Sequence, residues 1–172
     1  MNKKLPLLAG VLLAGLTPQA LARNPPTSVK PEVIEKLGKH GVGKIVFVKR
    51  ATNGADHYYT EYLTGNWAPN GSICTLDLKT GTVQELVPQL KGGMFERFDV
   101  SFDAKRVVFA YRATQPVGYR IYEINVDGTG LRQLTFPPPD EDERIKKFGS
   151  DRCTDDMQPC YLPDGGIVFI ST

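Results

Sequence analysis

The sequence predicts an all-β protein built from a sheet that is repeated along the chain. Between residues 98 and 135, short runs of β-branched and aromatic residues alternate with turn residues such as Asp127-Gly128-Thr129-Gly130. Asp-Gly and Gly tolerate the positive φ of tight hairpins, so this stretch should form three or four antiparallel strands. A sheet of this size is only marginally stable alone. It therefore needs neighbours of its own kind.

Such neighbours are visible as a strand centred on phenylalanine. The runs Ile45-Val46-Phe47-Val48, Val107-Val108-Phe109-Ala110 and Ile167-Val168-Phe169-Ile170 resemble one another, and their phenylalanines recur at nearly equal intervals. The hairpin that follows also recurs, since the segment from Ile73 to Gly81 resembles the segment from Ile121 to Thr129. Repetition of a four-stranded meander indicates a β-propeller or a related array. The interval exceeds the usual period of about 40–45 residues, which fits long connecting loops.

We therefore expect residues 44–172 to form an incomplete β-propeller of about two and a half four-stranded blades, at about 44–90, 94–136 and 157–172. The first blade would lack its first strand, and the third would stop at Thr172. Because propellers close with about four or more blades, we expect a piece of a longer protein. Two alternatives stay open: the repeats pair between chains, or the first and last strands meet in a smaller open sheet.

Residues 1–22 have the features of a secretory signal peptide. Lys3 and Lys4 form a positive start, Leu5 to Leu16 is a short apolar region, and Ala20-Leu21-Ala22 is a cleavage site. The alternative is an uncleaved membrane anchor, but the apolar stretch is short for a bilayer span. We expect a periplasmic or secreted protein without stable membrane insertion after cleavage.

Residues 23–43 should form an N-terminal arm that ends in a short helix. Arg23 to Pro31 is rich in proline and polar, which favours an extended chain. Residues 32–40 place Val33, Ile34 and Leu37 on one helical face. A first strand should begin at Lys44.

The charge balance argues against a nucleic-acid partner. Without Lys3 and Lys4 the chain has 19 basic and 19 acidic residues, whereas nucleic-acid binding favours a basic surface. We expect instead a protein partner or a small ligand at the loops of the propeller.

Two sets of motifs resemble known families. YEINVDGTGLRQLT followed by YLPDGGIVFIST resembles the TolB-type, WD40-like β-propeller repeat over roughly residues 45–172. DDMQPCYLPDGGIVFIST, with FDVSFDAKRVVFAYR before it, more narrowly resembles the propeller domain of hydrazine synthase alpha-subunit-like proteins. The resemblance implies a propeller fold. It implies no activity by itself, because propellers host unrelated functions.

No catalytic residue is assigned from the sequence. It contains no Gly-x-Ser-x-Gly elbow, no His-Glu-x-x-His helix and no phosphate-binding glycine loop. Hydrazine synthase alpha-type proteins carry covalent haem, which needs Cys-x-x-Cys-His. That motif is absent, and His40 and His57 are the only histidines. We expect no cofactor in this chain, with haem only in a missing region. We expect an exported β-propeller that acts as a binding or scaffold module. The alternative is the propeller part of a multidomain enzyme of the hydrazine synthase or prolyl-oligopeptidase type, whose catalytic part is absent here.

The three cysteines suggest two different roles. Cys74 shares its strand face with Leu76 and Leu78 and should be buried. Cys153 and Cys160 lie close together in the sequence of an exported chain, which makes them candidates for a disulfide. The alternative is that these two cysteines bind a metal ion. No third or fourth ligand lies nearby in the sequence, so no metal site is assigned.

Two long loops are candidates for a binding site. Residues 51–71 gather five aromatic or imidazole side chains, and long loops with such residues favour contact surfaces. These candidates are His57, Tyr58, Tyr59, Tyr62 and Trp67. The alternative is that the rings are buried on the blade. Residues 136–157 carry clustered acids and bases, which we interpret as a solvated charge run rather than a calcium site.

Overall fold

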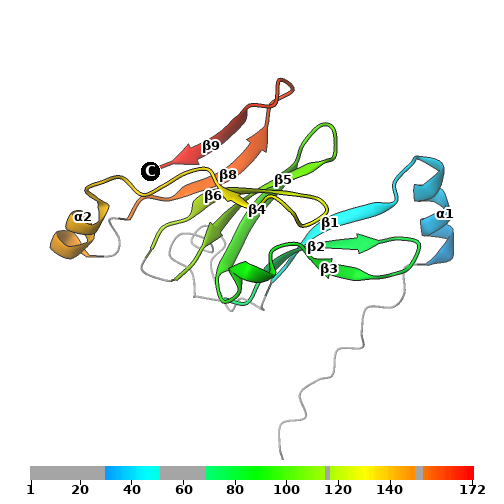
Figure 1. Ribbon diagram of the computed structural model, residues 1–172, viewed down its shortest axis with the longest axis horizontal. Helices are drawn as coiled ribbons and strands as arrows, with labels where there is room; N and C mark the ends of the chain where they lie inside the picture. The colour runs from blue at the N-terminus through cyan, green and yellow to red at the C-terminus, as the bar shows by residue number, and fades with distance from the viewer. Residues whose placement is uncertain (1–29, 51–68, 115–116, 150–152) are drawn as a thin grey trace, which may run out of the picture.

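The computed structural model describes residues 30–50, 69–114, 117–149 and 153–172. Within these residues the strands form three antiparallel sheets, in the orders β1-β2-β3, β4-β5-β6-β7 and β8-β9 (Figure 1). The elements are α1 (Pro31–Lys39), β1 (Lys44–Lys49), β2 (Ser72–Asp77), β3 (Val83–Glu85), η2, a 3-10 turn (Pro88–Leu90), β4 (Met94–Val100), β5 (Arg106–Arg112), β6 (Arg120–Asn125), β7 (Arg132–Gln133), α2 (Glu141–Phe148), β8 (Asp156–Tyr161) and β9 (Ile167–Ser171). The predominance of strands confirms the all-β prediction.

Strand pairing in the first two sheets reproduces the repeat in the sequence. Phe47 pairs with Cys74 across β1 and β2, and Phe109 pairs with Tyr122 across β5 and β6. Phe47 and Phe109 are equivalent positions of the repeated strand, and Cys74 and Tyr122 are equivalent positions of the repeated hairpin. The two hairpins therefore have the same register, residue for residue.

The third sheet continues the correspondence. The register between β4 and β5 shifts between Phe95 and Phe98, and the register between β8 and β9 shifts between Met157 and Cys160. In both cases the irregular strand precedes the strand that carries the repeated phenylalanine. Phe169 thus lies on the strand that corresponds to β5, which confirms the predicted equivalence of the three phenylalanine strands.

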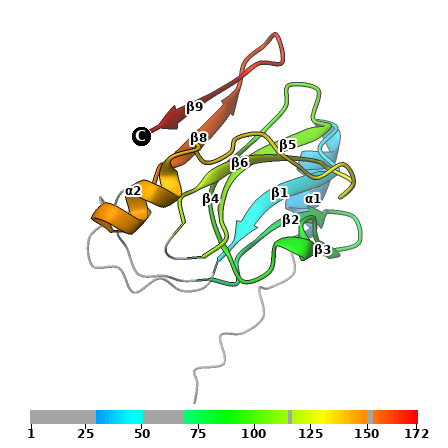
Figure 2. The ribbon, with the colours of Figure 1, turned by 60° about the vertical axis from the view of Figure 1, so that its left-hand side comes forward.

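The second sheet lies between the first sheet and the β8–β9 hairpin (Figure 2). Both of its faces are apolar, and each packs against a different neighbour. The first core lies between it and the first sheet and contains Ile73, Leu86, Val87, Phe95, Val107, Phe109, Tyr111 and Ile124. The second core lies between it and β8 and contains Val108, Ala110, Tyr119, Ile121, Met157 and Tyr161. Side chains of β5 alternate between the two cores, as the two-residue period of a strand requires. All residues from Val107 to Ala110 are 0% exposed, so β5 is the centre of the fold.

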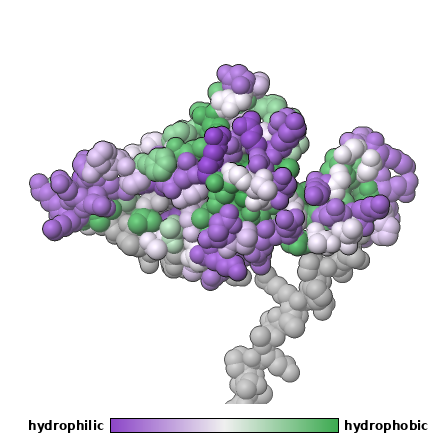
Figure 3. All heavy atoms as spheres, viewed as in Figure 1, coloured by the Kyte–Doolittle hydropathy of each residue, from purple (hydrophilic) through white to green (hydrophobic). Residues whose placement is uncertain are grey.

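β9 is covered much less than β5. Val168 is 50% exposed and Ile170 is 52% exposed, although the corresponding Val108 and Ala110 are fully buried. Hydrophobic side chains accordingly reach the surface in the region of β8 and β9, whereas α2 is mainly hydrophilic (Figure 3). The difference in exposure arises because β5 is covered on one face by the first sheet and on the other by β8.

The N-terminal helix confirms one sequence expectation. α1 begins with Pro31 at its first turn and ends at Lys39, within one residue of the expected range. Proline suits this position because its missing N–H would have no partner there. Lys39 and Glu35, one helical turn apart, form an exposed ion pair at 2.8 Å. β1 begins at Lys44, as expected.

The second helix corrects a sequence expectation. Residues 141–148 form α2, whereas the sequence analysis assigned them to a long loop between strands. Acids in the first turn and Lys146 and Lys147 in the last turn match the helix dipole, which favours negative charge at the N-terminus and positive charge at the C-terminus. Glu141 is only 4% exposed, so one of the acids is not solvated. In the described part of the chain no helix is long and apolar enough to cross a membrane.

Candidate functional site

The aromatic site predicted from the sequence falls outside the described residues. His57, Tyr58, Tyr59, Tyr62 and Trp67 all belong to residues 51–68, and the signal peptide belongs to residues 1–29. Both stay predictions.

The cysteines are free thiols in this structure. Cys74 is 0% exposed on β2, as expected, and burial raises the pKa of its thiol. A hydrogen bond with Asp99 raises the pKa of Cys160, and burial raises the pKa of Cys153. A raised pKa keeps a thiol protonated and weakly nucleophilic. The Cys153–Cys160 bridge stays a prediction.

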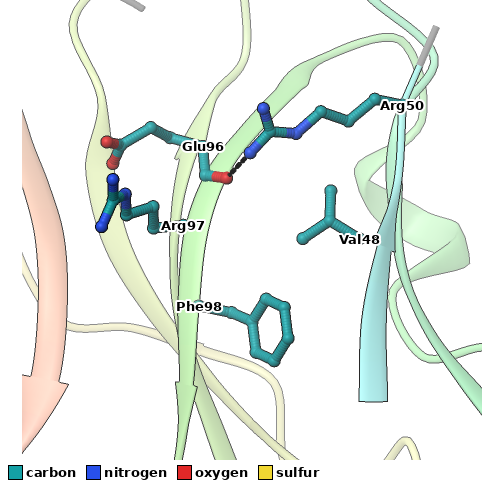
Figure 4. A pocket seen from close by; sticks show the side chains of 5 residues that line it. All are labelled: Val48, Arg50, Glu96, Arg97 and Phe98. Atoms are coloured by element: carbon teal, nitrogen blue, oxygen red, sulfur yellow. Dashed lines mark hydrogen bonds between the residues drawn. The ribbon is translucent and has the colours of Figure 1, made fainter. Parts of the chain in front are cut away.

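A pocket of about 280 Å³ lies where the end of β1 meets β4 (Figure 4). Five described residues border it. They are Arg50, Arg97, Glu96, Val48 and Phe98. Arg50 donates a hydrogen bond to the backbone carbonyl of Glu96, which ties the chain after β1 to β4. The described lining therefore joins the first and second sheets.

The irregular register of β4 shapes this pocket. Phe95 and Phe98 both pack with the first core, although an even alternation would place them on opposite faces. The shift between them leaves Glu96 and Arg97 on the other side of the strand from Phe98 (Figure 4). Such a bulge redirects side chains, and it occurs often beside functional sites.

Glu96, beside the pocket, has the most unusual side chain of these residues. It is 1% exposed, and its Oε2 accepts a hydrogen bond of 3.0 Å from the backbone N–H of Gln158 on β8. Its Oε1 has no hydrogen-bond partner among the described residues. Burial raises the pKa of this carboxyl group and outweighs the opposing effects of the Gln158 N–H, Arg97 and Arg50.

Tyr119 provides a second buried polar atom without a described partner. Its side chain is 0% exposed, and its hydroxyl makes no hydrogen bond in the described residues. Burial raises its pKa to about 12, and the charges of Arg112, Glu96, Asp155 and Arg50 make further contributions. The charge of Glu96 is one of the contributions that raise the pKa of Tyr119.

A second polar cluster centres on Glu123, and it is fully paired. Glu123 is 3% exposed and accepts hydrogen bonds from Arg106 at 3.3 Å, Arg132 at 2.8 Å and the Tyr161 hydroxyl at 2.8 Å. An adjacent cavity of about 230 Å³ lies between the β4–β5 and β8–β9 hairpins. Because both carboxylate oxygens have partners, this cluster joins the second and third sheets rather than offering an open group.

A third cluster fixes α2 to the sheets. Glu141 accepts a hydrogen bond of 2.7 Å from Arg120 on β6 and one of 2.6 Å from the Thr154 N–H before β8. Burial acts to raise the pKa of Glu141, but the hydrogen bonds from Thr154 and Arg120 lower it below 4.5 overall. Gly118 belongs to the same junction, since an added Cβ would lie 1.7 Å from the Thr154 carbonyl oxygen.

The pocket residues were not identified by the sequence analysis. The available signal was Phe95-Glu96-Arg97-Phe98, two adjacent charges inside a strand between phenylalanines. Strand alternation would send one of these charges into a core, which is costly without a partner. In the described residues no group of three or more His, Cys, Asp or Glu side chains could hold a metal ion.

Comparison with known proteins shows a similarity of fold. No family model and no curated protein sequence matches the chain. The solved structure of hydrazine synthase from Kuenenia stuttgartiensis is similar over 76% of this chain, with 19% identity and a TM-score of 0.50. The match covers 17% of the hydrazine synthase chain. At this identity the similarity concerns the fold alone, so this chain has a fold similar to one part of hydrazine synthase.

Proposed function

We propose that the chain is a binding or scaffold module of the β-propeller type, exported from the cell, and part of a longer protein. The observation that carries the proposal is the repeated register of β1–β2 and β5–β6. Similarity to a small part of a much longer chain supports the modular interpretation. The sheets would be successive blades, at about residues 44–90, 94–136 and 157–172, of a TolB-type or hydrazine-synthase-alpha-like propeller.

The partner would bind at the loops, because rigid strands that carry long loops are a common arrangement for binding. His57, Tyr58, Tyr59, Tyr62 and Trp67 are the proposed contacts. The test is capture of a defined partner from a periplasmic extract by the full chain, compared with Tyr59→Ala and Trp67→Ala. We expect loss of capture at an unchanged melting temperature. Equal loss of capture and stability would contradict the proposal and assign the rings to the core.

Export is tested separately. Protein recovered from the periplasm or the medium should begin at Arg23, since cleavage is expected after Ala22. N-terminal sequencing checks this. Recovery of the chain in the cytoplasm with Met1 intact would contradict the export proposal and leave the fold unaffected.

The second candidate is the propeller part of a multidomain enzyme, and the hydrazine synthase similarity favours it. The residues of this chain do not fit covalent haem, because it lacks Cys-x-x-Cys-His and Cys74 is buried between strands. Any such chemistry would belong to residues beyond this sequence. Sequencing the gene past Thr172 distinguishes the candidates: haem-attachment motifs or a Gly-x-Ser-x-Gly elbow favour an enzyme, and further Asp-Gly repeats alone favour the binding module.

A further inference from the structure

One edge of β9 has no partner strand among the described residues, because the third sheet has two strands where the second has four. The equivalent strand of the second sheet, β5, pairs with β4 along one edge and with β6 along the other. β9 pairs with β8 along one edge. An unpaired edge presents a row of backbone N–H and C=O groups with which another strand can pair. The free edge of β9 therefore offers a place for a further strand.

Hydrogen bonds near both ends of β9 show which of its backbone groups point to the free edge. The Leu162 N–H donates to the Gly166 carbonyl at 2.8 Å, and the Thr172 N–H donates to the Asp155 carbonyl at 3.2 Å. Backbone groups alternate in direction along an antiparallel strand, so every second residue between Gly166 and Thr172 also faces β8. The intervening residues direct their N–H and C=O groups to the free edge. They are Ile167, Phe169 and Ser171.

The equivalent backbone groups of β5 pair with β6. The Val126 N–H donates to the Lys105 carbonyl at 2.9 Å, so by the same alternation Val107 and Phe109 also face β6. Phe109 and Phe169 are equivalent positions of the repeated strand. The free edge of β9 is thus the edge that carries the β6–β7 hairpin in the second sheet.

The composition of β9 differs from that of the other edge strands. Natural proteins protect exposed edges with short strands, charges, bulges or proline. In the described sheets, β3 has three residues, β7 has two, β1 has a lysine at each end, β4 has a register shift and two adjacent charges, and β8 has a register shift and a proline. β9 has no charge and no proline, and Val168, Phe169 and Ile170 are exposed. This composition suits pairing with a strand better than contact with water.

A hairpin beside β9 would also extend the second core. In the first core, the β6–β7 part of the second sheet contributes Tyr122, Ile124 and Leu131. The described residues of the third sheet contribute to the second core from β8 and from Ile167 of β9. Strands next to β9 would supply side chains in the places that β6 and β7 fill in the first core.

We propose that the free edge of β9 pairs with a β-hairpin of the same type as β6–β7, antiparallel and in the register in which β5 pairs with β6. The hairpin has apolar residues on its first strand, then an Asp-Gly turn and a short second strand. It belongs to the longer protein of which the chain is proposed to be part. The inference therefore rests on that part of the proposed function and names what the third sheet binds, and it does not involve residues 51–68.

The test is calorimetric titration of the full chain with a synthetic peptide of residues 119–135, which contains β6, the Asp127-Gly128 turn and β7. We expect saturable binding, because an extended peptide can add a strand to an exposed sheet edge. The matched control is the same peptide with Tyr122→Pro, which lacks the N–H that would meet Phe169. It should bind about tenfold more weakly. Absence of saturable binding, or equal binding of the two peptides, would overturn the proposal.

Hydrogen exchange locates the bound peptide on the chain. It should slow exchange at Ile167, Phe169 and Ser171, whose N–H groups face the free edge. Exchange at Val168 and Ile170 should change little, because these residues face β8. Protection of other strands without protection of β9 would assign the peptide to another surface and overturn the proposal.

Variants of Ser171 test the edge itself. Ser171→Pro removes an N–H that faces the free edge, a position where strands tolerate proline, so the melting temperature should change little. Peptide binding should weaken about tenfold, because one hydrogen bond is lost. Ser171→Ala keeps the N–H and should bind the peptide like the wild type. Equal effects of the two variants on peptide binding would contradict pairing at this edge.

A second copy of the chain is the other possible occupant, and sedimentation of the chain alone tests it. We expect a monomer. A dimer that Ser171→Pro dissociates would assign the edge to a second copy and overturn the assignment to a hairpin. The titration is independent of partner capture through Tyr59 and Trp67, so failure of this proposal and failure of the loop-binding function are observed separately.

Discussion

The Glu96 carboxyl group on β4 accepts a hydrogen bond of 3.0 Å from the backbone N–H of Gln158 on β8, a residue far along the chain. Gln158 lies in the register shift of β8 and has a φ of 53°. A bulged residue loses its partner in the strand ladder. The β4 carboxyl group therefore replaces that partner and joins the second sheet to the third.

Asp99 makes a parallel connection and provides the first prediction. Its Oδ2 accepts a hydrogen bond of 2.8 Å from the Tyr161 N–H. Asp99→Ala should lower the free energy of unfolding by about 1–3 kcal/mol, because a partly buried N–H loses a charged acceptor. Urea denaturation measures this loss, and faster hydrogen exchange at Tyr161 should accompany it. Glu143→Ala removes an exposed acid from α2 and should change stability little. Equal effects of the two variants would contradict the connection.

The repeated phenylalanines should differ in their contribution to stability. Phe109 is 0% exposed and packs on Phe95 and Tyr122, with ring centroids 5.7 Å and 5.9 Å away. Phe109→Ala should cost about 3–5 kcal/mol in the free energy of unfolding, as buried Phe truncations do. Phe169→Ala should cost less, because that side chain is 38% exposed. Phe102→Ala, at 73% exposure, is the control. A loss below about 1 kcal/mol for Phe109→Ala would exclude Phe109 from the core.

Removing the hydroxyl group should lower the stability of the protein at one buried tyrosine, Tyr161, and not at another, Tyr119. The Tyr161 hydroxyl donates to Glu123 at 2.8 Å, so Tyr161→Phe should lower the free energy of unfolding by about 1–3 kcal/mol. The Tyr119 hydroxyl has no described partner, so Tyr119→Phe should leave stability unchanged or raise it. Denaturant unfolding at neutral pH compares the pair. A clear loss in Tyr119→Phe would mean that its hydroxyl has a partner.

The contacts of Glu141 with Arg120 and Thr154 should make the free energy of unfolding depend on pH in the acid range. The folded-state pKa of Glu141 lies below 4.5, so its contribution is fully present above that pH and is lost as the pH falls through the folded value. Glu141→Ala should cost about 2–3 kcal/mol at neutral pH, because Arg120 loses the nearer of its two buried carboxylate partners and keeps Asp156 at 4.0 Å. Glu141→Gln should show less loss of stability on acidification than the wild type. An unchanged acid profile would show that other carboxylates control the acid transition.

The repeat and the register of its hairpins follow from the amino-acid sequence. Aligning the two copies predicts the pairing of Phe109 with Tyr122 from that of Phe47 with Cys74, and both pairings are observed. These features are local, since a hairpin register depends on the turn and on the alternation of apolar residues. Gly128, with a φ of 87°, occupies the turn that its sequence predicts.

The position of α2 and the burial of Glu96, in contrast, depend on tertiary contacts. Residues 141–148 are mostly polar and form α2. Glu141, at the start of this helix, is held by Arg120 and Thr154, two residues that are distant from it in the sequence. Glu96 and Arg97 share one side of β4 because the register slips between Phe95 and Phe98. A period of two assigns adjacent residues to opposite faces, and only pairing with β5 shows where that period is broken. The burial of Glu96 depends on strands far along the chain, so no local pattern could reveal it.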